Sequence, residues 1–192
     1  MEDLNMVKMM MTTKLWRALD ACRASKKDNR EALLCLHITE KHIETTNGIQ
    51  LIRFNRDNIG LDAAVTGVFK VISITKAKQF TEVIIDAAPD VQYPDTLQVL
   101  PIIVTPLQNT DAIMLEDGNS ISISGAIIRL FKITGNAFSY AVLERLAYIN
   151  TRWGLCAGSM DKPDPTTWKS AKAILYNKEY GISTVILPFQ LI

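Results

Sequence analysis

Three residues near position 40 are the first candidates for chemistry, because cysteine and histidine side chains bind metal ions. Cys35 and His37 would lie on the same face of a β-strand, His42 follows, and Cys22 is a more distant fourth candidate. The spacing contains neither the C-x-x-C nor the H-x-x-x-H pair typical of zinc sites. We therefore expect no metal, with the cysteine in the core and the histidines at the surface.

The second candidate is the thiol of Cys156, which lies in a G-x-C-x-G run from Gly154 to Gly158. This run matches a nucleophile elbow, which needs a strand that turns sharply into a helix. Here a predicted helix precedes the run, and both histidines lie far upstream. The two glycines instead indicate a strand end or a bulge.

Phosphate-binding loops are also missing from the sequence. It contains no G-x-x-x-x-G-K-[ST] and no G-x-G-x-x-G run, so no cofactor is expected. Two histidines and three cysteines leave little of the usual catalytic repertoire. We predict that the protein is not an enzyme.

The composition indicates a folded protein with a balanced charge. The chain has 192 residues, 48% of them hydrophobic, which suffices for one ordinary domain or two small ones. Lys and Arg number 21 against 20 Asp and Glu, so the net charge is +1 and any basic surface must be local. The few cysteines are widely spaced, and no apolar run reaches about 18 residues. We expect a soluble, cytoplasmic protein that has no membrane partner.

A local basic surface is predicted on the first helix, which Thr12 or Thr13 can cap and which should run to about Lys26. An apolar stripe recurs along it at 100° per residue, formed by Leu15, Ala18, Leu19 and Cys22. Four cations point away from this stripe, with Asp20 as the only acid among them: Lys14, Arg17, Arg23 and Lys27. These cations form either a phosphate-binding surface or an ordinary solvated helix face.

Short strands and turns surround this helix in the first half of the chain. A turn is expected at Thr46-Asn47-Gly48, because Asn and Gly accept positive φ at little cost. A Pro-punctuated stretch runs from Pro89 to Pro106. The predicted strands are Val7–Met11, Ala32–Ile38, Gln50–Phe54, Gly67–Ile74 and Glu82–Ala87.

The second half of the chain predicts a hairpin, a helix and three strands. The hairpin joins Ile113–Leu115 to Ser120–Ile133, because isoleucine and serine alternate from Ile121 to Ser124. The second helix starts at Thr134 or Asn136 and carries an apolar stripe of Phe138, Val142, Leu146 and Ile149. The closing strands are Leu155–Gly158, Ala171–Asn177 and Ser183–Leu187.

This order of elements predicts an α+β fold built from a helix-plus-meander unit used twice. Both amphipathic helices are expected to pack on one face of an antiparallel sheet. The first unit spans residues 1–69 and the second 134–192, and residues 70–133 hold inserted strands and the Pro-containing connector.

The repeated unit resembles one domain of the DNA polymerase sliding clamps of the bacterial polymerase III β-subunit type. Residues 33–54 are similar to a clamp segment in which a strand leads to a T-x-x-D/N-G turn and a further strand. The run ISTVILPFQL at 182–191 resembles the final strand of a clamp. Tyr93-Pro94-Asp95 and Val99-Leu100-Pro101 are similar to the Y-P-D-x-x-x-V-L-P stretch near clamp domain junctions. The middle of the chain is thus either an insertion into a single clamp-like domain or the place where two abbreviated domains meet.

The resemblance implies a ring that encloses duplex DNA, lines its hole with helices and makes a polymerase or repair factor processive. It implies a DNA polymerase or other replication protein as partner, and a homo-oligomer, because these clamps close six domains into a circle. The non-specific contact with the DNA backbone would involve Lys14, Arg17, Arg23 and Lys27. The alternative is a non-enzymatic assembly module of viral or mobile-element type that self-associates through sheet edges without nucleic acid.

Overall fold

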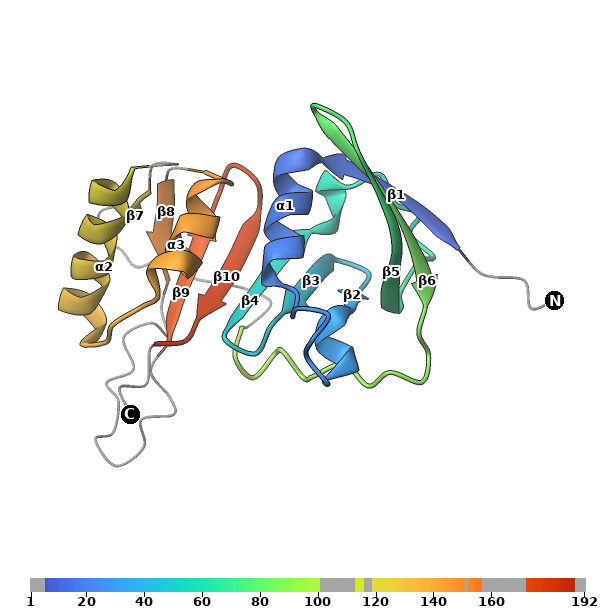
Figure 1. Cartoon of the computed structure of the whole chain (residues 1–192), viewed down its shortest axis with the longest axis horizontal. Coiled ribbons are helices and arrows are strands. Elements are labelled where there is room, and N and C mark those ends of the chain that lie inside the picture. The colour runs from blue at the N-terminus through green and yellow to red at the C-terminus, as the bar shows by residue number, and fades with distance from the viewer. Residues whose placement is uncertain (1–5, 101–112, 116–118, 151, 157–171, 189–192) are drawn as a thin grey trace. The chain divides into compact units, whose positions relative to one another are not determined.

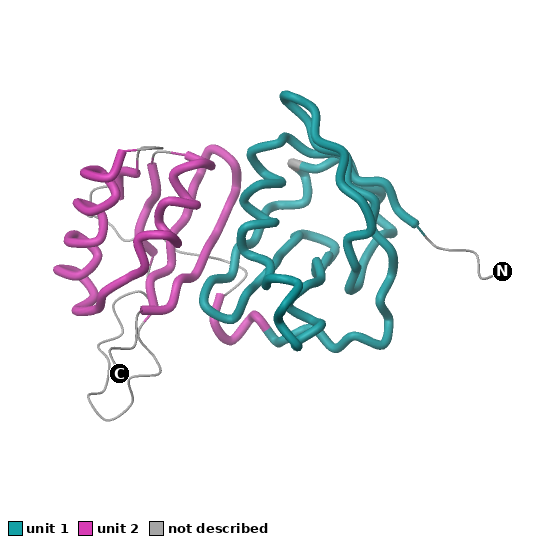
Figure 2. Tube along the Cα trace, viewed as in Figure 1, with its two compact units in different colours: residues 1–95 teal, residues 96–192 magenta. Residues whose placement is uncertain are grey.

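The computed structural model describes residues 6–100, 113–115, 119–150, 152–156 and 172–188 (Figure 1). The chain forms two compact units, residues 1–95 and 96–192 (Figure 2). The boundary directly follows the Y-P-D run and lies inside the expected 70–133 insertion. The assignment of the whole chain to one clamp-like domain stays a prediction.

From residue 6 onward, where the structure describes it, the first unit is a six-stranded antiparallel sheet with one α-helix. Its strands pair in the order β1-β6-β5-β2-β3-β4. Its elements are β1 (Val7–Thr12), α1 (Thr13–Cys22), the 3-10 helix η1 (Glu31–Leu34), β2 (Leu36–Ile38), β3 (His42–Thr46), β4 (Gln50–Asn55), the 3-10 helix η2 (Arg56–Asn58), β5 (Gly67–Lys76) and β6 (Phe80–Ala87).

Helix α1 begins where the sequence predicts and ends one turn earlier. The hydroxyl of Thr12 caps it by accepting the N–H of Leu15 at 3.3 Å. The helix lies on the sheet, where the hydroxyl of Thr45 on β3 donates to the Leu19 carbonyl at 2.9 Å. The expected end at Lys26 is wrong, because the backbone is already extended at Arg23 (φ −78°, ψ 150°). The apolar stripe of the helix is buried as predicted.

The turn predicted between the strands of the first unit is confirmed, although the strands beside it differ. Gly48 has a φ of +86°, and the Asn47 side chain accepts the N–H of Gln50 at 2.8 Å. This turn joins β3 to β4. The first part of the strand expected over Ala32–Ile38 is instead the 3-10 helix η1, so β2 is short.

In its described residues, the second unit is a four-stranded antiparallel sheet with two α-helices. Its strands pair in the order β10-β9-β8-β7. Its elements are β7 (Ile113–Met114), α2 (Ser120–Thr134), α3 (Tyr140–Ala147), β8 (Arg152–Leu155), β9 (Ala173–Asn177) and β10 (Ile182–Ile186).

Both units contain a strand, followed by helical structure and then by a meander of three strands. The meander is β2-β3-β4 in the first unit and β8-β9-β10 in the second. In the first unit the hairpin β5–β6 stands between β1 and this meander. The predicted α+β class with antiparallel sheet is therefore observed, whereas packing of the helices on one face stays a prediction.

Residues 120–133, expected to form one strand of a hairpin, form helix α2 instead. Asn119 caps the helix, since its side chain accepts the N–H of Ser122 at 3.0 Å, and Gly135 ends it in the left-handed conformation. The buried residues Ile123, Ala126 and Leu130 follow helical spacing. The described part of the chain thus has three α-helices where two were predicted.

The second predicted helix starts later than expected. Gly135 ends α2, and α3 begins at Tyr140 after the extended N-cap residue Ser139. Its predicted apolar stripe is buried throughout: Phe138, Val142, Leu146 and Ile149. None of the helices in the described part of the chain combines the length and apolar character that a bilayer span requires.

Candidate nucleic-acid interface

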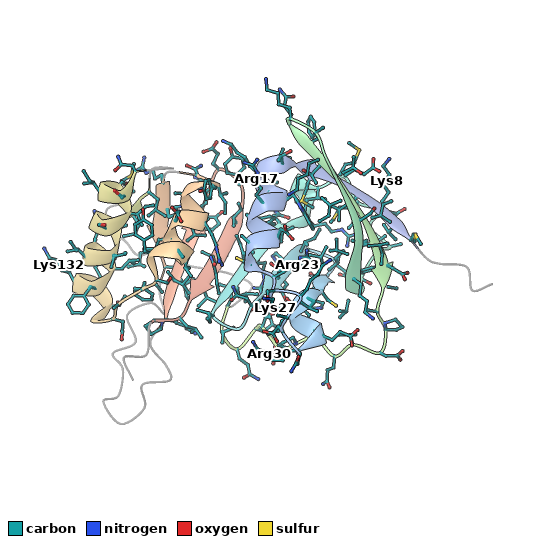
Figure 3. The ribbon with its side chains drawn as sticks, in the orientation of Figure 1. Lys8, Arg17, Arg23, Lys27, Arg30 and Lys132 are labelled. Carbon is teal, nitrogen blue, oxygen red and sulfur yellow. The ribbon has the colours of Figure 1, made fainter. Side chains whose placement is uncertain are left out.

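Two of the four predicted DNA contacts lie on one turn of α1. Lys14 and Arg17 are both exposed, while their neighbours Leu15, Trp16 and Ala18 are buried in the first unit. Figure 3 shows Arg17 on α1. Neither cation forms an ion pair among the described residues. Their positive charges therefore face solvent without a neutralising acid.

Arg23 differs from these two cations because the chain itself uses its guanidinium. Nη2 donates to a carboxylate oxygen of Asp20 at 2.5 Å, and Nη1 donates to the Leu34 carbonyl at 3.0 Å. The group also lies over the ring of Trp16, 5.6 Å from the centroid, and the side chain is only 18% exposed. A contact between Arg23 and DNA stays a prediction, and it would require giving up these bonds.

Lys27 lies beyond α1, in the loop that leads to η1 (Figure 3). It is exposed, and its backbone N–H donates to the hydroxyl of Ser25 at 3.3 Å. In the same loop Arg30 binds Asp28 with two donors, at 2.9 and 2.7 Å, and these bonds lower the pKa of Asp28 to about 2. Arg30 thus neutralises the nearby acid, which leaves the positive charge of Lys27 uncompensated.

A buried charged row, which our sequence reasoning missed, crosses three strands of the first unit. Glu44 on β3 accepts from Arg53 on β4 at 2.7 Å and pairs with His37 on β2 at 2.8 Å. Glu44 and Arg53 are almost fully buried. The signal was available in part, because a turn at Asn47-Gly48 sets the register that places Glu44 opposite Arg53.

Tyr93 joins this row from the segment that follows β6. Its ring stacks on His37, with centroids 4.7 Å apart. Burial raises the pKa of the Tyr93 hydroxyl far above its usual value, and the charge of Glu44 adds to the effect. Burial is also the main cause of the lowered pKa of His42, ahead of the charge of Arg53. The row holds the Tyr93 segment to the sheet and offers no exposed nucleophile.

Two of the residues considered as metal ligands, Cys35 and His37, are engaged in other contacts. The thiol of Cys35 is buried and lies 3.5 Å from the Glu31 carbonyl, and burial raises its pKa. His37 is paired with Glu44. No group of three or more His, Cys, Asp or Glu side chains gathers into a possible metal site within the residues described above.

Cys156 directly follows β8, and its N–H donates to the Ile174 carbonyl on β9 at 2.9 Å. The residue is fully buried, and burial raises the pKa of its thiol to about 11. The thiol is therefore protonated at neutral pH, unlike an activated nucleophile. Ala157 and Gly158, the last residues of the G-x-C-x-G run, lie outside the described residues.

Comparisons with known proteins give similarity at the level of structure. No family model matches the sequence, and no curated protein matches it. The chain is similar to the structure of a putative DNA polymerase III β subunit from Eubacterium rectale (TM-score 0.49, 11% identity). It is similar to the same degree to a sliding clamp (DNA polymerase III subunit β) from Bartonella birtlesii that was bound to griselimycin.

These alignments cover 98% of this chain, which spans 66% and 67% of the two clamp chains.

Proposed function

We propose that this chain is a non-catalytic, clamp-like accessory protein of DNA replication or repair that contacts duplex DNA without sequence preference. The observation that carries this proposal is the outer face of α1, where Lys14 and Arg17 are exposed and form no ion pair among the described residues. Cations at such a surface release counterions from phosphates and do not read base edges. A contact of this kind can move along DNA.

The four predicted DNA contacts play unequal parts in this proposal. Lys14 and Arg17 form its centre, and Lys27 extends the positive surface beyond the end of α1. Arg23 takes part only when its guanidinium leaves Asp20. The unit charges of the remaining three side chains give a weak, salt-sensitive contact.

A clamp-like role also requires closure around DNA and a partner that uses it. The sequence resemblance implies six domains in a ring, more than the two compact units of this chain. A homo-oligomer closed through heterologous edges is therefore part of the proposal. Its partner is a DNA polymerase or another replication protein.

The test reverses the charges of α1. The variant K14E/R17E should lose at least about tenfold in affinity for duplex DNA at low salt, measured by fluorescence anisotropy with duplexes of unrelated sequence, because attraction becomes repulsion. The control K8S/K70S removes two lysines that are already paired with acids, Lys8 with Glu82 and Lys70 with Glu31. It should bind like the wild type. Equal binding by K14E/R17E and wild type, or a strong preference for one sequence, would contradict the proposal.

The second candidate function is assembly without nucleic acid, and the edge of the second unit favours it. Among the described strands of this unit, β7 is the last in the order, and it exposes Met114. The neighbouring α2, whose Ser122 hydroxyl donates to the Met114 carbonyl at 3.3 Å, exposes Ile121 to 83%. An apolar sheet edge of this kind can pair with another copy of the chain. Light scattering and DNA binding, measured on K14E/R17E and on the wild type, separate the two candidate functions. If K14E/R17E still assembles but no longer binds DNA, the clamp-like function is supported. If the wild type assembles but does not bind DNA, assembly without nucleic acid is supported.

A further inference from the structure

The end of the hairpin β5–β6 carries two lysines that the proposed function has not used, Lys76 and Lys78. Both are exposed, and neither forms an ion pair among the described residues. Residues 70–81 contain no Asp or Glu, so the strand ends supply no neutralising charge. Lys8 and Lys70 differ, because each lies 2.6 Å from an acid. The charge at the hairpin end is therefore uncompensated.

Hydrogen bonds tie this hairpin end to the start of α1. The N–H of Thr13 donates to the Gln79 carbonyl at 2.8 Å, and its hydroxyl donates to the Ala77 carbonyl at 3.0 Å. Lys78 lies between these two acceptor residues, and Lys14 directly follows Thr13. Figure 1 shows the hairpin end beside the start of α1. Lys78 and Lys14 thus lie on the two sides of one hydrogen-bonded junction.

Strand register places Lys76 on the side of the hairpin that faces α1. Lys76 on β5 is opposite Thr81 on β6, and opposite residues of an antiparallel pair share a face. Thr81 is buried, and its hydroxyl donates to that of Thr13 at 3.2 Å. Lys76 therefore lies on the same side of the sheet as α1 and its two exposed cations.

We infer that Lys76 and Lys78 form one phosphate-binding surface together with Lys14 and Arg17, and that its ligand is the backbone of duplex DNA. This inference rests on the proposed function and adds a β-hairpin to the contact made by α1. Duplex DNA carries one charge for roughly every 1.7 Å of its axis, so a surface that spans two elements meets several phosphates. The lysine side chains contact phosphates, which keeps the binding independent of sequence.

The experiment measures how the affinity of the full chain for duplex DNA depends on salt. The slope of log K against log salt concentration changes by about 0.9 for each phosphate that the protein no longer neutralises. K76S/K78S should therefore lower the magnitude of the slope by roughly 1.8, and K14S/R17S by a similar amount. The matched control K8S/K70S should keep the wild-type slope, and K76R/K78R, which keeps both charges, should do so as well.

Each outcome decides between the inference and the proposed function. A wild-type slope for K76S/K78S, together with a lowered slope for K14S/R17S, overturns the inference and leaves the proposed function standing. If the wild type does not bind DNA, both the inference and the proposed function are overturned. If it then binds anionic lipid vesicles, the cationic surface is assigned to a different polyanion. A lowered slope in K76S/K78S with the wild-type slope in K76R/K78R supports the inference, because the arginine variant keeps both charges and the serine variant loses them.

Discussion

Glu44 is a buried carboxylate held between a histidine and an arginine. Each partner comes from a neighbouring strand, His37 from β2 and Arg53 from β4, at 2.8 and 2.7 Å. A buried charge is expensive to desolvate, and its partners offset that cost only while they remain. We therefore expect that removing one member of the Glu44–Arg53 pair lowers the free energy of unfolding more than replacing both members does.

We predict that R53M lowers the free energy of unfolding by roughly 3–5 kcal/mol, because it leaves the Glu44 charge buried with fewer partners. The double variant E44L/R53M should recover most of this stability, since no buried charge remains. Urea denaturation of the single and double variants measures both values. Additive effects, with the double variant less stable than R53M, would show that the pair is not coupled.

Periodicity at the level of single residues predicted which cations of α1 are exposed and which apolar side chains are buried. It could not predict that the guanidinium of Arg23 is bound within the chain. Asp20 is three residues away and visible in the sequence, but the Leu34 carbonyl becomes an acceptor only after the chain folds back through η1. The turn at Asn47-Gly48 indicates that Glu44 lies opposite Arg53, but the contacts of His37 with Glu44 and Tyr93 form only in the folded unit.

At the scale of elements, α2 shows where local pattern reading fails. Ile121 to Ser124 alternate like a strand, but this pattern covers only four residues of a helix of 15. The signals that set the element lie at its ends, with Asn119 as the N-cap and Gly135 beyond the last turn. The caps and the burial of apolar residues at helical spacing over three turns stabilise a helix more than four alternating residues stabilise a strand.

Two glycines of this region provide a matched test of the helix. G125A should raise the free energy of unfolding by about 0.5–1 kcal/mol, because Gly125 is inside α2 and a Cβ there meets nothing within 4 Å. G135A should lower it by about 1–2 kcal/mol, because Gly135 has a φ of +74° that alanine adopts only with strain. Urea midpoints measure both changes, and effects of the same sign would contradict the helix and its end as described.

At the scale of the whole molecule, the antiparallel α+β class was predictable from two features of the sequence, amphipathic helices and strands joined by short turns. The pairing of the strands was not predictable from the sequence. Strand β1 pairs with β6, which lies far along the chain, and no local pattern reports this contact. The sequence left open whether two abbreviated domains meet in the middle of the chain, because the division at residue 95 depends on which segments pack together rather than on composition.

The measurement that tests the central claim most directly is retention on nicked circular duplex DNA during gel filtration at low salt. A clamp-like protein should stay with the circle and leave when one cut makes the DNA linear, because it encloses the duplex and holds it by weak phosphate contacts. The variant K14E/R17E should be retained less than the wild type. Absence of the protein from the circular DNA, or equal retention before and after linearisation, would contradict the account.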